Sequence, residues 1–164
     1  MNIFRGLLKF FRGLRMANAS LPRKLPMVAV LTGGLAADGD RATLTETAES
    51  AHLDLQVARS CDEAWHVAGR LRAPVIAYDR DIQDTEWREA VGMLSALPHR
   101  PILILISPVA DEYLSNELFR IGGFDVLRKP LRADDVSRVL AQALLYWRSE
   151  AWRGAAPSSA KRTG

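Results

Sequence analysis

The stretch PILILIS (101–107) has the purest strand pattern of the chain, with an unbroken apolar run up to Ile106. A strand that is buried on both faces has such a run, because neither face of its sheet meets water. The stretches MVAVLT (27–32), APVIAYD (73–79) and FDVLRKP (124–130) are comparable, whereas LDLQVA (53–58) alternates as a half-exposed edge strand does. The sequence therefore predicts five short strands.

Amphipathic stretches separate these five strands. The capping boxes Thr43-x-x-Glu46 and Ser60-x-x-Glu63 predict helices over 43–51 and 60–72. GGLAADGD (33–40), before the first of these helices, is predicted to be a loop. Three more helices are expected, in TEWREAVGMLSAL (85–97), in DEYLSNELFRIG (111–122), and along the inward stripe Val136, Val139, Leu140, Ala143, Leu144 and Trp147.

Strict alternation of strands and helices predicts the fold class. Helical crossovers require parallel pairing of the strands, and right-handed crossovers leave few topologies. We expect a doubly wound α/β fold with a five-stranded parallel sheet in the flavodoxin-like order 2-1-3-4-5, because the second strand has an edge pattern. In such sheets the functional site lies at the carboxyl ends of the strands.

Three polar residues of different chemistry follow three consecutive strands. Asp79 ends the third strand, Ser107 ends the fourth, and Lys129 follows the fifth. A carboxylate can attack a phosphoryl donor, while a hydroxyl and an ammonium can hold the phosphoryl oxygens. Each residue could instead be an ordinary turn or capping residue, but their joint placement favours a site.

Composition limits the remaining possibilities. The chain has 164 residues, 48% of them hydrophobic, which suits one domain with a core. The single cysteine excludes a disulfide framework and a multi-cysteine zinc site. Basic residues are concentrated at the two ends of the sequence, and residues 25–152 are acidic overall. We therefore expect no nucleic-acid binding by the domain itself.

The chain divides into three parts. Residues 1–24 form a basic segment without acids, residues 26–150 form the domain, and residues 153–164 are expected to be a disordered tail. In a helix, residues 3–14 would place apolar side chains on one side and basic ones opposite. This segment could contact a membrane surface or a partner, and the alternatives are a helix packed on its own domain or a poorly ordered leader.

Three stretches resemble the receiver domain of bacterial two-component response regulators. They are VIAYDRDIQDTEW (75–87), ILILIS (102–107) and IGGFDVLRKPL (121–131), and the resemblance extends over residues 26–146. The last stretch matches the receiver signature at Gly122, Asp125, Leu127, Lys129 and Pro130.

The resemblance implies a role for each candidate residue. It makes Asp79 the phosphoacceptor, Ser107 the switch hydroxyl and Lys129 the phosphate-sensing lysine. It also implies a Mg²⁺ ion held by Asp79 and by the backbone carbonyl of Asp81.

Receivers carry two adjacent acids at the end of the first strand, and this chain has Leu31-Thr32-Gly33-Gly34 there. Asp38 and Asp40 are candidate substitutes as metal ligands. Val126 stands where receivers have an aromatic residue, and Gln83 stands where they have a proline. These departures predict weak metal binding and weak phosphoryl transfer.

The primary expectation is a stand-alone, divergent receiver-like signalling module of a phosphorelay. It would be cytoplasmic and not an enzyme, and it would act through contacts with a histidine kinase, a downstream effector or a second copy in a homodimer, with phosphorylation at Asp79. The alternative is a phosphorylation-independent pseudo-receiver scaffold. A third reading is a small flavodoxin-like ligand-binding protein or enzyme, with TGGLAADGD (32–40) as an anion-binding loop.

Overall fold

A five-stranded parallel sheet forms the centre of the molecule. The structure, a computed structural model, describes residues 23–33 and 35–149. The predictions for residues 3–14 and for the tail 153–164 lie outside this part. The strands are β1 (Leu25–Val30), β2 (Leu53–Ala58), β3 (Val75–Asp79), β4 (Ile102–Ser107) and β5 (Asp125–Arg128), and their order is β2-β1-β3-β4-β5. The predicted fold class and strand order are confirmed.

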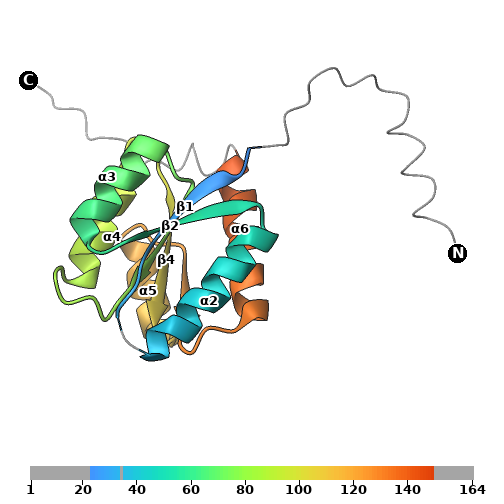
Figure 1. Cartoon of the computed structure of the whole chain (residues 1–164). Helices are drawn as coiled ribbons and strands as arrows, with labels where there is room; N and C mark the ends of the chain where they lie inside the picture. The colour runs from blue at the N-terminus through green and yellow to red at the C-terminus, as the bar shows by residue number, and fades with distance from the viewer. Residues whose placement is uncertain (1–22, 34, 150–164) are drawn as a thin grey trace, which may run out of the picture.

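Helices cover both faces of this sheet, as Figure 1 shows. One face carries α2 (Leu35–Ser50) and α6 (Ala133–Arg148). The other face carries α3 (Cys61–Leu71), α4 (Trp87–Ser95) and α5 (Glu112–Arg120). None of the helices in the part of the chain described here is long and apolar enough to cross a membrane.

The two faces of the sheet contribute to two separate apolar clusters. Along β4, Leu103 and Leu105 point toward α3, α4 and α5, whereas Ile102, Ile104 and Ile106 point toward α2 and α6. All five side chains are buried. Burial on both faces explains why the central strands have unbroken apolar sequences.

The start of α2 differs from the sequence prediction. The helix begins at Leu35 rather than at Thr43, so the expected loop over 33–40 is mostly helical and the Thr43-x-x-Glu46 capping box is wrong. Asp40 explains the difference, because its side chain is buried and its Oδ1 accepts a hydrogen bond from Leu131 N at 2.7 Å. This tertiary contact anchors the early turns of a helix that Gly39 would weaken in isolation by about 1 kcal/mol.

The other predicted element boundaries agree with the structure within two residues. Ser60 is the N-cap of α3 and accepts a hydrogen bond from Glu63 N at 3.1 Å, as the second capping box predicts. Gly122, just after α5, has a φ of 100°, which glycine adopts without a steric penalty. The parallel pairing of β3, β4 and β5 brings their carboxyl ends to one edge of the sheet.

Candidate functional site

The carboxyl ends of β1, β3, β4 and β5 bring together residues that are distant in sequence. Asp79 lies opposite Ile106, and Ser107 lies opposite Arg128. Backbone hydrogen bonds extend the pairing beyond the strands, because Arg80 N donates to Ile106 O and Lys129 N donates to Ser107 O. The backbone of this edge is therefore fixed up to the residues that carry the polar side chains.

The Asp79 carboxylate is buried and accepts hydrogen bonds from three residues. Lys129 Nζ lies 2.7 Å from Oδ1 and 2.6 Å from Oδ2. Thr32 donates to Oδ2 through Oγ1 at 2.9 Å and through its backbone N at 3.3 Å. Asp81 N donates to Oδ1 at 2.9 Å. A buried carboxylate is tolerated in a protein only when it is paired in this way.

Lys129 links two carboxylates. Its Nζ also lies 3.2 Å from Asp81 Oδ2, and its side chain is largely buried. Burial lowers the pKa of the Lys129 ammonium, but the hydrogen bond and charge of Asp79, followed by those of Asp81, outweigh burial and raise this pKa above the usual lysine value. Lys129 is therefore a positively charged bridge between the two aspartates at neutral pH.

Ser107 lies at the same edge in a different hydrogen-bonding environment. Its hydroxyl accepts from Val109 N at 3.2 Å and from Arg80 Nη1 at 3.5 Å. The Arg80 guanidinium also lies 5.9 Å from the centre of the Trp87 ring, within cation–π range. Thus Lys129 contacts Asp79 directly, and Ser107 contacts the residue that follows Asp79.

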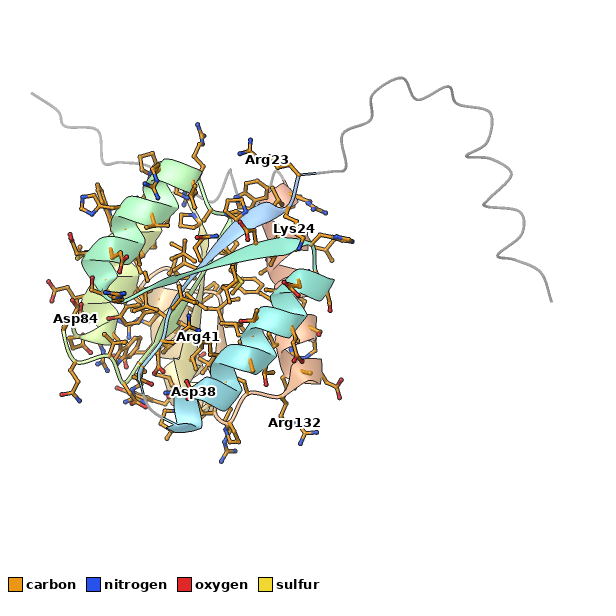
Figure 2. All side chains as sticks on the ribbon, viewed as in Figure 1. Arg23, Lys24, Asp38, Arg41, Asp84 and Arg132 are labelled. Atoms are coloured by element: carbon orange, nitrogen blue, oxygen red, sulfur yellow. The ribbon has the colours of Figure 1, made fainter. Side chains whose placement is uncertain are left out.

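The candidate substitutes for the missing acids lie in α2. Asp40 is buried and holds Leu131 N, so its carboxylate connects α2 to the segment after β5. Asp38 is exposed and lines a surface hollow together with Thr32, Arg41 and Arg59. Figure 2 shows Asp38 and Arg41 on α2. Within residues 23–33 and 35–149, no group of three or more His, Cys, Asp or Glu is placed to hold a metal ion.

The residues at this edge do not fit the Mg²⁺ ion that the resemblance implies. Mg²⁺ requires oxygen ligands in near-octahedral geometry. Here Asp79 Oδ2 accepts two hydrogen bonds from Thr32, which supplies protons where receivers supply a carboxylate. Lys129 can rotate away from Asp79, but the Thr32 N–H, two residues after β1, would still occupy one acceptor position of Oδ2.

Two contributors to the site were missed by sequence reasoning. Thr32 was noted only as the absence of an acid, although a threonine at the end of β1 is a hydrogen-bond donor at the same place. Arg80 contacts Ser107 and Trp87, and nothing in the sequence around Asp79 showed which way its side chain points. The predicted strand order already put Thr32 next to Asp79, so this contact could have been expected. The direction of the Arg80 side chain could not be predicted from the sequence.

Neither a family model nor a curated protein sequence matches the chain. Among solved structures, a two-component response regulator from Clostridium difficile is similar with a TM-score of 0.64 and 14% identity, over 76% of this chain and 99% of that chain. The chemotaxis protein CheY4 of Vibrio cholerae is similar with a TM-score of 0.63 and 17% identity, over 73% and 98%. The signal receiver domain of a modulated diguanylate cyclase from Desulfovibrio desulfuricans is similar with a TM-score of 0.61 and 24% identity, over 76% of this chain and 97% of that chain. The described part of this chain has the fold of response regulator receiver domains.

Proposed function

We propose that this chain is a receiver-like signalling module that acts through contacts with other proteins, and that its Asp79 site works without a divalent metal ion. The observation that carries the proposal is the hydrogen bonding of Asp79 Oδ2. Thr32 donates to this oxygen twice and Lys129 Nζ lies 2.6 Å from it. The charge of Asp79 is therefore compensated by groups of the protein itself, chiefly the Lys129 ammonium.

A second candidate is that Asp79 accepts a phosphoryl group within a phosphorelay. The favouring observation is that Asp79 and Lys129 are in contact and that Ser107 lies at the same edge. A hydroxyl and an ammonium in these places could hold phosphoryl oxygens. Without a metal, however, the negative charges of the donor and of Asp79 have less compensation in the transition state.

Incubation with acetyl phosphate, with and without Mg²⁺, separates these two candidates. The readout is the intact mass of the protein, and the variants are Asp79→Asn, Thr32→Asp and the uncharged control Thr32→Asn. If the site is metal-free, the natural chain gains no phosphoryl group in either buffer. Thr32→Asp, which restores one acid at the end of β1, gains both Mg²⁺ affinity and phosphoryl mass, and Thr32→Asn gains neither.

The opposite result identifies a phosphoacceptor. A phosphoryl mass on the natural chain that requires Mg²⁺ and disappears in Asp79→Asn would overturn the metal-free proposal. The mass gain of Thr32→Asp should itself be lost when Asp79→Asn is added, because Asp79 is the nucleophile in that variant.

The partner-binding surface that we propose lies on α5 and α6, which flank the edge strand β5. Tyr113 and Phe119 on α5 and Leu145 and Tyr146 on α6 are large apolar residues that are exposed. Exposed aromatic residues are enriched in protein–protein interfaces. A histidine kinase, a downstream effector or a second copy of the chain could bind there, and we infer a cytoplasmic location for such a module.

Sedimentation velocity over a concentration series tests the second copy. A dimer that Phe119→Glu abolishes and that Met93→Glu, at an exposed position of α4, leaves intact would identify a homodimer at this surface. A monomer at all concentrations would exclude the homodimer.

A further inference from the structure

The two ends of the sheet carry different charges. We count as the amino end every position within two residues of the start of a strand or the end of a helix. The described basic residues at these positions are Arg23, Lys24, Arg70, Arg72, Arg100, Arg120 and Arg148. The described acids there are Glu49, Asp54 and Asp125. We call this surface the basic end. Basic residues outnumber acids there, although the domain as a whole is acidic.

The carboxyl end has the opposite balance by the same rule. Its acids are Asp62, Glu63, Asp79, Asp81, Glu86, Glu89, Asp111, Glu112, Asp134 and Asp135, and its basic residues are Arg59, Arg80, Arg88, Arg128, Lys129 and Arg132. The molecule is thus electrically polarised along the strands. Figure 2 shows Arg23 and Lys24 in the upper part of the view and Asp38 and Arg132 at the lower end.

Both basic terminal segments of the sequence leave the domain at the basic end. The chain enters β1 there, and α6 ends there because it runs antiparallel to the strands, as Figure 1 shows. The preceding 22 residues contain Arg5, Lys9, Arg12 and Arg15 without an acid, and the last dozen contain Arg153, Lys161 and Arg162 without an acid. Both basic segments of the sequence are therefore attached to the same end of the described domain.

Several of these basic residues form one surface. Arg23, Lys24 and Arg70 line a single hollow of about 570 Å³ together with one acid, Asp54, and all three basic residues are exposed. Arg70, Arg120 and Arg148 lie in the last turns of helices, where they also stabilise the helix dipoles. Arg23 and Lys24 lie outside the helices, so dipole compensation does not account for them, whereas Arg72 is the C-cap residue of α3.

We propose that the basic end is a docking surface for an anionic lipid bilayer. An anionic membrane attracts each nearby Lys or Arg by roughly 1 kcal/mol, and several such residues act together. The sequence leading into this end favours lipid over nucleic acid, because residues 3–14 interleave Arg5, Lys9 and Arg12 with large apolar residues that a nucleic acid would not need. In this orientation the Asp79 site and the carboxyl end of the sheet face away from the membrane.

Co-sedimentation of the full chain with lipid vesicles tests the proposal. Vesicles of phosphatidylcholine alone are compared with vesicles containing phosphatidylglycerol. The basic-end variant is Arg23→Glu, Lys24→Glu and Arg70→Glu together. The matched control, with the same change in net charge, is Arg41→Glu on α2 with Arg59→Glu and Arg132→Glu at the carboxyl end. All six positions are exposed. Circular dichroism and thermal unfolding verify that both variants fold.

We expect the natural chain to bind the anionic vesicles only, with an affinity that falls as salt is added. The basic-end variant should bind at least about tenfold more weakly, and the carboxyl-end control should bind as the natural chain does. Equal binding to both vesicle types, or equal losses in the two variants, overturns the proposal. Binding to a DNA duplex that is tighter than binding to anionic vesicles, with the loss confined to the basic-end variant, assigns the surface to nucleic acid and also overturns it.

Discussion

The two ends of the sheet use charge in different ways. At the carboxyl end, Asp79 is 2% exposed and its charge is met by the short, directional contacts of Lys129 and Thr32. At the amino end, Arg23, Lys24 and Arg70 are exposed around one hollow. A buried charge requires fixed partners because water is absent, whereas an exposed charge is already solvated and acts through the sum of many like charges.

The largest expected effect comes from breaking the buried pair. Lys129→Met leaves the Asp79 carboxylate without its cation, and the free energy of unfolding should fall by about 3 kcal/mol. Urea unfolding followed by circular dichroism measures this loss. The control Lys24→Met removes an exposed lysine at the amino end and should change stability by less than about 0.5 kcal/mol. A loss below about 1 kcal/mol in Lys129→Met would show that Asp79 is not electrostatically dependent on Lys129.

The second prediction concerns the hydroxyl of Thr32. Thr32→Val keeps the side-chain shape but removes the donor to Asp79 Oδ2, and should cost about 1.5 kcal/mol because the acceptor is charged and buried. The matched control is Thr45→Val, since the Thr45 hydroxyl donates only to Arg41 O within its own helix. The control should lose less than about 0.5 kcal/mol in the same urea titration. Equal losses in both variants would contradict a special role for Thr32.

The third prediction is a pH dependence at the carboxyl end. Because the pKa of Lys129 is raised in the folded state, its contribution is fully present below the usual lysine value of 10.5 and is lost as the pH rises through the folded pKa. The difference in unfolding free energy between the natural chain and Lys129→Met should therefore shrink above that pH. Part of it should persist, because a neutral amine can still donate a hydrogen bond. A difference that stays constant up to about pH 11 would contradict the pairing.

The smallest expected effects compare one substitution at both ends. Arg70→Glu puts an acid in the last turn of α3 and should destabilise the protein by about 0.5 kcal/mol. Arg132→Glu puts an acid at the N-cap of α6, where Arg132 makes no capping hydrogen bond, and should stabilise it by a similar amount. Thermal unfolding at low and high salt checks both signs, and added salt should shrink both effects. Changes of the same sign at the two ends would contradict the dipole argument.

Local sequence signals predicted most of the fold. The apolar runs of β3 and β4 and the cap at Ser60 are each specified by neighbouring residues, and the structure agrees with them. The start of α2 could not be predicted in the same way, since Asp40 stabilises it through Leu131 N, 91 positions away in the chain. Local rules therefore favoured the capping pattern at Thr43, which lies inside the helix.

The sequence predicted which residues lie at the candidate site better than it predicted which of them are in contact. Strand order implied that Asp79, Ser107 and Lys129 would lie at one edge, and the structure has Lys129 bonded to Asp79 and Ser107 bonded to Arg80. The direction of the Arg80 side chain and the use of the Asp81 carboxylate were not visible in the sequence. Both depend on which neighbours a side chain meets after the strands have assembled.

The sequence by itself determined the order of the elements, the burial of the central strands and the position of basic residues near the chain ends, because hydrophobic period and charge are properties of consecutive residues. Only the tertiary structure decided that Thr32 and Lys129 share the Asp79 carboxylate and that Arg80 contacts Ser107. Contacts of this kind depend on strand order and helix direction, which bring together residues that no local pattern relates.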